Sequence, residues 1–407
     1  MVIIGAGEAG VRAALALRQE GHAGPVTLVG DEAHAPYERP PLSKDTLTGD
    51  DDPQPRTIAD AAALAAAGIE WLAGRRAVTI ERADRRVVLA DGTALAYDKL
   101  LLATGAIARR IPFPGSGAGR CLTLRSFDDS LALRRRLSPG ARVAIIGGGF
   151  IGLELAASAS RRGATVSLIE AQPRILARGV PAEIAEVVHR RHRDAGVALV
   201  CGTGIAAIEA EGEGAVVVLA DGRRVEADLV VLGVGAAPVT ALAEAANLTI
   251  DNGIAADATL RTSDPDIYAA GDCCSFPLPV YGGRRVRLES WRSAQEQGGL
   301  AARNMLGAGE AVSAVPWFWS DQHDLTLQVA GLADEGVRTV RRDLTADAFI
   351  LFHLAADGRL VAAGGIGPGN AVARDIRLAE MLIGRRASPD PALLAEAGYR
   401  LKGLLAA

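Results

Sequence analysis

The chain opens with MVIIGAGEAG at residues 1–10, an apolar run that passes directly into the spacing Gly-x-Gly-x-x-Gly. A helical pattern follows from residue 11, so the stretch predicts a strand, a tight turn and the N-terminus of a helix. In such a turn Gly5 permits the bend, Gly7 lets the backbone approach a pyrophosphate, and Gly10 lets the helix pack on the strand. The free amides and the positive end of the helix then face the phosphates. The stretch therefore indicates a dinucleotide-binding fold.

The same pattern returns as VAIIGGGFIG at residues 143–152. In each copy a second strand follows the helix and ends close to an acid, Asp31 in the first copy and Glu170 in the second. A carboxylate at this place can hold a ribose diol. In the first copy Gly30 ends the strand and the acid stands one residue later. Two such copies indicate two dinucleotides bound by one chain.

Composition limits the remaining classes of function. A chain of 407 residues is long enough for two or three domains, and 49% apolar with 23% charged residues is ordinary for a globular protein. The net charge of -4 argues against nucleic-acid binding. No run of about 18 apolar residues predicts a membrane span, and the N-terminus lacks the basic region of a signal peptide. We expect a soluble, cytoplasmic protein with no membrane or nucleic-acid partner.

The cysteines and histidines predict no metal site. Four cysteines are too few for a disulfide framework, and none forms Cys-x-x-Cys. The pair Cys273-Cys274 is adjacent in sequence, where a disulfide would be strained. The six histidines are scattered and show no zinc-type spacing.

Three further segments allow both a ligand-binding and a structural interpretation. PYERPPLSK at residues 36–44 is a proline-stiffened loop, and its Arg39 and Lys44 either line a ring-shaped ligand or are solvated charges. Asp272 ends a strand after Gly271, where it either accepts a ligand hydroxyl or caps the next segment. PWFWSDQ at residues 316–322 holds two of the four tryptophans, as core filler or as a face against a flat ring.

The repeat extends beyond the glycines, because the buried strands at residues 100–106 and 229–238 correspond to each other. Alternating strands between residues 325 and 366, closed by a helix at 374–383, predict a small α+β domain. The fold class is therefore α/β, with two Rossmann-like dinucleotide-binding domains and a small C-terminal α+β domain. We predict residues 1–110 with 236–313 as one discontinuous nucleotide domain, 111–235 as the second, and 314–407 as the C-terminal domain.

Beyond single motifs, essentially the whole chain resembles the FAD-dependent, NADH-oxidising ferredoxin reductases of bacterial oxygenase systems, the putidaredoxin-reductase type. The most specific stretches are PPLSK at residues 40–44 and WFWSDQ at 317–322, and ATG at 103–105, GFIGLE at 149–154, AAGD at 269–272 and ESW at 289–291 agree with them. Residues 367–375 fit only loosely.

The resemblance implies a glutathione-reductase-like plan with non-covalent FAD and with NADH. The residues expected at FAD are Gly5, Gly7, Ala9, Gly10, Asp31, Arg39, Lys44, Val78, Thr104, Arg125, Asp272, Trp291 and Trp319. The residues expected at NADH are Gly147, Gly149, Phe150, Ile151, Gly152, Glu154, Glu170 and Gly235.

The chemistry implied by the resemblance is transfer of a hydride from NADH to the flavin, followed by release of single electrons to a [2Fe–2S] ferredoxin. The cofactors carry out the redox steps, so the residues expected to be catalytic, Lys44 and Glu154, act through charge and position. We expect the ferredoxin to dock on a basic surface made by Arg284, Arg285, Arg287, Arg292, Arg338, Arg341 and Arg342. The sequence does not predict an oligomeric state.

Four alternatives belong to neighbouring classes. A disulfide reductase needs a cysteine pair beside the flavin, which the sequence lacks, and an NADH oxidase of the single-cysteine type needs a thiol where this chain has Pro-Leu-Ser-Lys. A slow-turnover NADH sensor of the apoptosis-inducing-factor type and a rubredoxin reductase share the motifs and stay open.

Overall fold

The computed structural model describes residues 1–405, and the chain divides into two compact units, each built from three segments. Unit 1 consists of Met1–Glu38, Pro55–Ile107 and Ala237–Pro316, and unit 2 consists of Arg39–Gln54, Ala108–Ala236 and Trp317–Ala407. Each unit is described separately below.

A five-stranded parallel sheet in the order β19-β7-β1-β2-β3 is the centre of unit 1. Its strands are β1 (Val2–Ile4), β2 (Val26–Val29), β3 (Ile69–Leu72), β7 (Leu100–Leu102) and β19 (Ile267–Ala269). The four strands other than β3 are buried along their full length, which explains why they read as continuous apolar runs.

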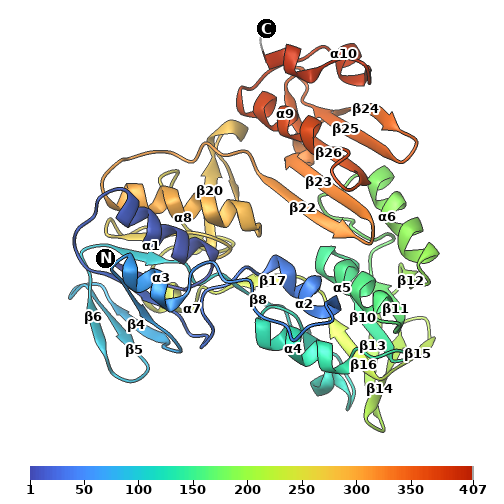
Figure 1. The fold of residues 1–407 in the computed structure, drawn as a ribbon, viewed down its shortest axis with the longest axis horizontal. Helices are drawn as coiled ribbons and strands as arrows, with labels where there is room; N and C mark the ends of the chain where they lie inside the picture. The colour runs from blue at the N-terminus through green and yellow to red at the C-terminus, as the bar shows by residue number, and fades with distance from the viewer. Residues whose placement is uncertain (406–407) are drawn as a thin grey trace. The chain divides into compact units, whose positions relative to one another are not determined.

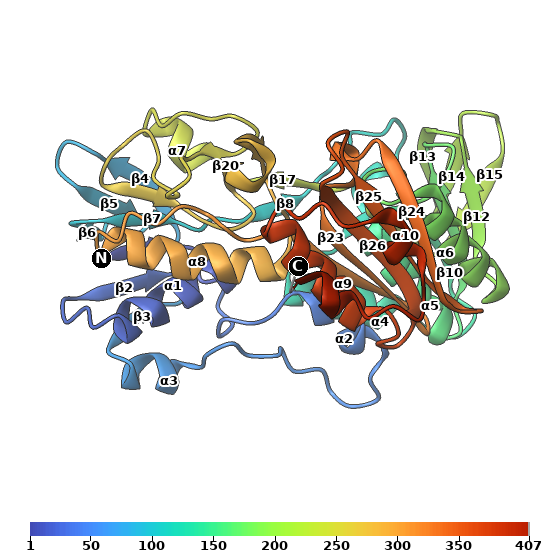
Figure 2. The ribbon, with the colours of Figure 1, turned by 90° about the horizontal axis from the view of Figure 1, so that it is seen from above.

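Two long helices lie side by side in unit 1, α1 (Glu8–Gln19) and α8 (Trp291–Met305) (Figures 1 and 2). They approach closely because Gly298 has no side chain, and a Cβ built there would lie 2.3 Å from the carbonyl oxygen of Ala9. Two three-stranded sheets and short helices complete the unit, namely β4 (Ala77–Glu81), β5 (Arg86–Leu89), β6 (Ala94–Ala96), β18 (Ile254–Ala255), β20 (Cys274–Leu278), β21 (Arg284–Val286), α3 (Ala61–Ala66), α7 (Ala241–Ala245) and η3 (Pro279–Tyr281).

Unit 2 repeats the parallel sheet in the order β12-β11-β10-β16-β9. Strand β10 pairs with β11 and β16 as β1 pairs with β2 and β7, so the internal repeat seen in the sequence is a structural one. The elements are β9 (Leu122–Thr123), β10 (Arg142–Ile146), β11 (Thr165–Glu170), β12 (Ala198–Cys201), β16 (Leu229–Leu232), η2 (Ala118–Arg120), α4 (Phe127–Arg136), α5 (Phe150–Arg161), α6 (Ala182–Asp194), and an antiparallel sheet of β13 (Ile205–Glu211), β14 (Gly214–Leu219) and β15 (Arg224–Ala227).

The C-terminal part of unit 2 is an antiparallel sheet in the order β22-β23-β26-β25-β24 with helices beside it. Its elements are β22 (Trp317–Gln322), β23 (Leu325–Gly331), η4 (Ala333–Glu335), β24 (Arg338–Thr345), β25 (Ala348–Leu354), β26 (Leu360–Pro368), α9 (Ala373–Gly384), α10 (Pro391–Ala395) and η5 (Leu401–Leu405). The C-terminal segment is held by Arg342 of β24, which is 3% exposed and donates to the carbonyls of Leu394, Ala397 and Tyr399.

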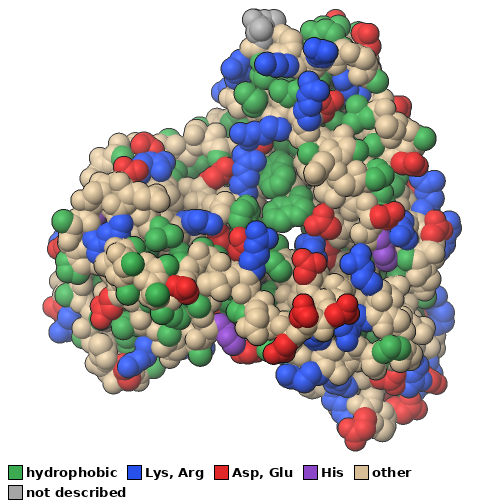
Figure 3. Space-filling model, in the orientation of Figure 1, with side chains coloured by type: hydrophobic (Ala, Val, Ile, Leu, Met, Phe, Trp, Pro, Cys, Tyr) green, Lys and Arg blue, Asp and Glu red, His purple; other side chains and the backbone are tan. Residues whose placement is uncertain are grey.

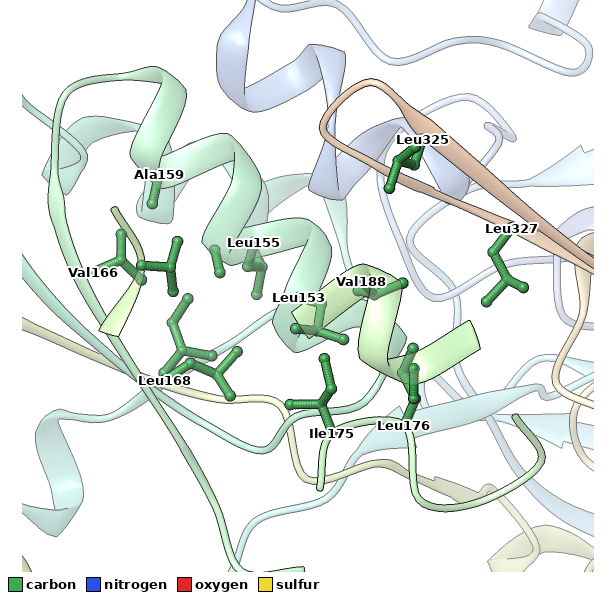
Figure 4. Close-up of a cluster of buried hydrophobic side chains, with 14 of the residues drawn as sticks. Leu153, Leu155, Ala159, Val166, Leu168, Ile175, Leu176, Val188, Leu325 and Leu327 are labelled. Atoms are coloured by element: carbon green, nitrogen blue, oxygen red, sulfur yellow. The ribbon is translucent and has the colours of Figure 1, made fainter. Parts of the chain in front are cut away.

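One apolar core runs through unit 2 from its parallel sheet to its antiparallel sheet. Leu153 of α5, Leu168 of β11 and Val188 of α6 belong to the same buried cluster as Leu325 and Leu327 of β23 (Figure 4). The nucleotide fold and the C-terminal sheet are therefore packed into one body within this unit.

Two short strands, β8 (Ala106–Ala108) and β17 (Ala236–Pro238), carry the chain between the units and pair with each other. The segment 39–54 also belongs to unit 2, where it forms the 3₁₀ turn η1 (Pro40–Ser43) and the short helix α2 (Asp45–Thr48). The three-domain division read from the sequence stays a prediction.

The fold class expected from the sequence is confirmed by the two parallel sheets and the C-terminal α+β part. Helix α3 begins at Ala61, because Asp60 caps it by accepting from the amide of Ala63. The tryptophan-rich segment forms strand β22. Within residues 1–405, no helix is long and apolar enough to cross a membrane.

Candidate functional site

The first glycine turn lies in unit 1 between β1 and α1. Gly5 has a φ of +111°, and a Cβ built on it would lie 2.1 Å from the carbonyl oxygen of Ala103. A Cβ on Gly10 would lie 1.8 Å from the Gly5 carbonyl oxygen, whereas one on Gly7 would meet nothing within 4 Å. Gly5 and Gly10 are thus required by packing, and Gly7 leaves open space in front of the helix N-terminus, where a phosphate is accommodated.

The second turn, in unit 2 between β10 and α5, has the same geometry. Gly147 has a φ of +111°, and its built Cβ would lie 2.4 Å from the carbonyl oxygen of Gly233. A Cβ on Gly152 would lie 2.0 Å from the Gly147 carbonyl oxygen, and Gly149 again faces open space. Among the residues described, the N-cap positions of α1 and α5 are glycines without a side-chain hydrogen bond, so the first amides of both helices are available to an anion.

Unit 1 brings the expected flavin residues Ala9, Asp272 and Trp291 to one place. Gly271, the residue before Asp272, has a φ of +82° and lies against α1, since its built Cβ would be 3.0 Å from the Cβ of Ala9. The Gly271 amide donates to Gln297 Oε1 on α8, the helix that Trp291 begins (2.9 Å). The end of β19 and the N-terminal parts of both helices therefore meet at one edge of the sheet.

Asp31 and Thr104 follow strands of the same parallel sheet, whereas Val78 lies on the β4-β5-β6 sheet. Asp31, after β2, pairs with Arg76 at 3.6 Å. The hydroxyl of Thr104, after β7, donates to the Val239 carbonyl (2.7 Å). Val78 lies on β4 and is 46% exposed, which is consistent with a contact through its backbone.

Glu170, at the end of β11, is oriented by two backbone amides. Its Oε2 accepts from the amide of Gly148 (2.6 Å) and its Oε1 accepts from the amide of Gln172 (2.7 Å). Arg174, four residues on, donates to the carbonyls of Ile175, Leu176, Ala177 and Val180. Its guanidinium is therefore committed to its own loop.

The two residues expected to be catalytic form an ion pair in unit 2. Lys44 Nζ lies 3.1 Å from Glu154 Oε2, and the Glu154 side chain is 5% exposed. The hydroxyls of Ser43 and Ser320 donate to Glu154 Oε2 (2.5 Å) and Oε1 (2.6 Å). Two hydroxyls and one ammonium group therefore surround this buried carboxylate.

The loop that carries Lys44 is held by hydrogen bonds to its backbone. Ser130 of α4 donates to the Leu42 carbonyl (2.8 Å) and Ser158 of α5 donates to the Ser43 carbonyl (2.6 Å). Arg134 and Arg162 donate to carbonyls of α2 and its end. The ammonium group is thus placed by rigid backbone rather than by a free side chain.

Strand β22 presents different groups on its two faces because side chains alternate along a strand. Trp317 and Trp319 stack at 5.5 Å between ring centroids, and Lys44 Nζ lies 5.9 Å from the ring of Trp319. Asp321 shares that face, accepts from Trp319 Nε1 (3.2 Å), and lies 3.9 Å from Lys44 Nζ. Ser320 and Gln322 point the other way and are fully buried.

The remaining expected residues of unit 2 lie at two places. Arg39 donates to the backbone carbonyl of Arg125 (2.6 Å), which joins two residues expected at FAD. Phe150 begins α5 and packs edge-on against Phe318 (5.0 Å), while Ile151 beside it is 45% exposed. Gly235 follows β16 with a φ of +99°.

Sequence reasoning missed five residues of this site: Ser43, His192, Ser320, Asp321 and Gln322. WFWSDQ is three aromatic residues followed by three polar ones, so its sequence shows no alternation that would indicate a strand with a polar inner face. No sequence spacing indicates that His192 of α6 contacts Gln322 of β22, because the contact is tertiary.

The cysteines agree with a mechanism that uses no thiol. Cys273 and Cys274 are free and fully buried, and burial raises the pKa of both thiols. Within residues 1–405, no group of three or more His, Cys, Asp and Glu side chains is suited to a metal ion.

The expected basic docking surface is wrong for Arg342, which is buried because its guanidinium group donates to internal backbone carbonyls. Arg285 is exposed, and it donates to the carbonyls of Ala256 and Ser275. Three more have acidic partners, since Arg287, Arg292 and Arg341 pair with Glu289, Glu296 and Glu183. Elsewhere in unit 2, over the β13–β15 sheet, basic and acidic side chains are mixed (Figure 3).

The residues present fit a nucleotide at each glycine turn. In unit 1 the indole Nε1 of Trp71, next to Gly30 at the end of β2, and Glu8 Oε2 at the start of α1 are buried without a hydrogen-bond partner among the described residues. In unit 2, the oriented carboxylate of Glu170 has the position expected for a ribose ligand.

Similarity to known proteins covers the whole chain. Residues 1–298 match the family of pyridine nucleotide-disulphide oxidoreductases, and residues 317–405 match the reductase C-terminal family. The ferredoxin–NAD(+) reductase component of the anthranilate 1,2-dioxygenase system of Burkholderia cepacia is 44% identical over 405 residues, which cover 99% of this chain and 98% of that protein. Putidaredoxin reductase of Pseudomonas putida is 36% identical over 416 residues, which cover 100% of this chain and 97% of that protein.

A solved structure leads to the same group. The covalent putidaredoxin reductase–putidaredoxin complex superposes with a TM-score of 0.93 at 36% identity, covering 100% of this chain and 97% of that chain. Together with the two glycine turns, these matches show that the chain belongs to the pyridine nucleotide-disulphide oxidoreductase family, among its ferredoxin–NAD(+) reductases.

Proposed function

We propose that this chain oxidises NADH with bound FAD and passes the electrons singly to a [2Fe–2S] ferredoxin that serves a Rieske dioxygenase or a cytochrome P450. The observation that carries the proposal is the pair of glycine turns with the same backbone geometry, each followed by a strand that ends near an acid. One turn suits the pyrophosphate of FAD and the other that of NADH.

FAD, when bound, supplies the chemistry that accepts a hydride and gives up electrons one at a time. One NADH reduces two ferredoxins, and the products are NAD⁺, one proton and two reduced ferredoxins. The protein contributes binding and electrostatics. Helix α5 offers its N-terminal amides to the pyrophosphate of NADH, and Glu170 accepts from a ribose hydroxyl.

We assign the charge-bearing role to Lys44 and Glu154. The ammonium group of Lys44 favours negative charge on a reduced flavin ring, and Glu154 fixes the position of that ammonium group. Asp321 is the second carboxylate beside Lys44 and partly offsets the field of its ammonium group.

FAD retention tests the flavin part of the proposal. Asp272→Ala removes a carboxylate placed to accept a ligand hydroxyl, and a lost hydrogen bond to a charged group costs about 1.5–3 kcal/mol. We expect the Kd for FAD, from fluorescence titration of the apoprotein, to rise about 10- to 100-fold. Asp251→Ala, which removes an exposed carboxylate of the same unit, is the control and should bind FAD like the parent. Equal Kd values for all three proteins would remove Asp272 from the site.

The acceptor is tested by steady-state reduction of a [2Fe–2S] ferredoxin and of a rubredoxin by the same preparation. Preference for rubredoxin would support the rubredoxin-reductase alternative. Slow turnover with both acceptors, in a protein that still binds NADH, would support the sensor alternative. We further propose a cytoplasmic location, which fractionation of the native cells would test.

A further inference from the structure

A chain of buried hydrogen bonds joins Glu154 to the face of unit 2 beside α6. Ser320 donates to Glu154 Oε1 (2.6 Å), and Gln322 Nε2 donates to the hydroxyl of Ser320 (2.8 Å). Gln322 Oε1 lies 2.9 Å from His192 Nε2, and His192 Nδ1 lies 3.3 Å from His323 Nε2. Glu154, Ser320, Gln322 and His192 are all buried.

Because an ionised carboxylate only accepts, it determines the direction of every link in this chain. Ser320 must give its proton to Glu154, so its oxygen receives the Gln322 amide, and the Gln322 carbonyl oxygen must then face a donor. His192 is therefore the Nε2–H tautomer, and its Nδ1 accepts from His323 Nε2–H. Each group satisfies its neighbour only in this orientation, as buried polar groups require.

We propose that Ser320, Gln322 and His192 are positioning residues for Glu154, acting as a polarised relay that keeps its carboxylate charged and fixed against Lys44. This inference rests on the proposed role of the Lys44–Glu154 pair. It assigns the inner face of β22 and helix α6 a part in the reaction, although neither is expected to contact a cofactor through these side chains.

The charges around the relay agree with a neutral His192. Burial lowers its pKa most, and Arg191 and His189 nearby lower it further, although the bond to Gln322 acts in the opposite direction. Burial, His192 and Arg191 lower the pKa of His323 to about 4, with Asp324 opposing them and Arg161 adding to them. At neutral pH both rings are thus uncharged, and each is able to donate through one nitrogen and accept through the other.

The relay predicts a tautomer, which can be observed without turnover. Long-range ¹H–¹⁵N correlation spectra of the FAD-loaded protein, labelled in its six histidines, distinguish the two tautomers. We expect His192 to be the Nε2–H form, with its signals assigned from His192→Asn. In Glu154→Gln the terminal group both donates and accepts, so the direction is no longer fixed and a second His192 tautomer should appear.

Asp321→Asn is the matched control, because Asp321 also lies beside Lys44 but is hydrogen-bonded outside the relay, to Trp319 and Thr326. It should leave the His192 signals as in the parent. The proposal is overturned if His192 of the parent is the Nδ1–H form. It is also overturned if Glu154→Gln leaves the His192 tautomer unchanged, or if Glu154→Gln and Asp321→Asn change that tautomer equally.

A kinetic measurement connects the relay to the reaction. Gln322→Met keeps the length of the side chain but cannot donate to Ser320, so a buried carboxylate loses part of its support. The rate of flavin reduction by NADH, followed by stopped flow across pH, should fall below the parental rate at acid pH and match it at high pH. An equal loss at every pH would mean a packing role and would overturn the positioning role. If Glu154→Gln reduces flavin at the parental rate, the proposed role of Glu154 fails, while the tautomer result still judges the relay.

Discussion

At the scale of single residues, the coenzyme preference depends on one oriented carboxylate and one occupied arginine. Glu170 is held by two backbone amides, so it cannot swing away from a 2′-phosphate. Arg174, which the sequence places near enough to compensate, uses its guanidinium on four carbonyls of its own loop. The structure therefore makes the discrimination stricter than the sequence alone suggests.

We predict that NADH is preferred to NADPH and that Glu170→Ala raises the ratio of kcat/KM for NADPH to that for NADH about 10- to 100-fold. The 2′-phosphate of NADPH carries nearly two negative charges and is repelled by the Glu170 carboxylate. Each tenfold change in this ratio corresponds to about 1.4 kcal/mol. Glu209→Ala, an exposed carboxylate of β13 paired with Arg224, should leave the ratio unchanged. Comparable efficiency with both coenzymes in the parent would contradict this role of Glu170.

The second prediction at this scale concerns Cys273 and Cys274. Burial raises the pKa of both thiols, so neither forms a thiolate readily in the native protein. A thiol reagent should modify neither cysteine in the native protein and both cysteines after unfolding. The double variant Cys273→Ala, Cys274→Ala should reduce ferricyanide with NADH within a few-fold of the parental rate. Loss of flavin reduction with FAD still bound would restore a thiol mechanism.

At the scale of elements, α6 and the β22–β23 hairpin meet through histidines that fold in the neutral state. Burial lowers the pKa of His192 and His323, and also that of His353 on β25, while in the unfolded chain these groups return to about 6.5. As pH falls from about 6.5 towards 4, the unfolded state binds the protons first. Folding stability is therefore present above this window and is lost within it.

We predict that His323→Gln reduces this acid destabilisation. His323 is half-buried, so solvent screening limits its contribution to about 1–2 kcal/mol, or a few degrees in Tm. Thermal unfolding between pH 7.5 and pH 4.5 measures the difference, and glutamine retains a donor for His192. Above pH 6.5 the Tm curves of variant and parent should run parallel. Identical slopes below it would show that His323 is protonated equally in both states.

At this scale, the sequence predicted local features and could not predict contacts between distant segments. Glycine spacing and apolar runs are local, so both nucleotide folds and their acids were predicted from positions such as Gly5, Gly147 and Glu170. The partners of Glu154 come from distant segments, as Ser43 and Ser320 do. No periodicity in one segment reports a contact with another. The docking role of the arginines was misjudged for the same reason. A sequence gives the number of charged side chains but does not show which backbone carbonyls their guanidinium groups bind.

At the scale of the whole molecule, association with the acceptor is a separate process from hydride transfer. The net charge of -4 opposes a small acidic ferredoxin at long range, so any attraction must come from a local basic group. We predict that ferredoxin reduction slows as ionic strength rises from 0.01 to 0.1 M, because the Debye length shortens from about 30 to about 10 Å. Reduction of an uncharged quinone at saturating NADH should not change over this range.

Arg338→Glu and Arg342→Glu separate docking from folding in this test. Arg338 is exposed on β24, whereas Arg342 is buried and holds the C-terminal segment. The first should slow ferredoxin reduction and spare the quinone, and the second should lower thermal stability. A ferredoxin rate that ignores salt would exclude electrostatic steering.

The packing of α1 against α8 has a consequence for synthesis on the ribosome. Helix α1 is translated first, but its neighbour at Gly298 follows only after two crossings into unit 2 and back. At about 5–20 residues per second, the apolar face of α1, with Val11, Ala14 and Leu17, waits about 10–40 s between the completion of β7 and the emergence of α8. During this interval the nascent sheet lacks both β19 and its covering helix. We therefore expect the newborn chain to be a client for ribosome-associated chaperones, and its yield to depend on translation speed across the segment that encodes unit 2.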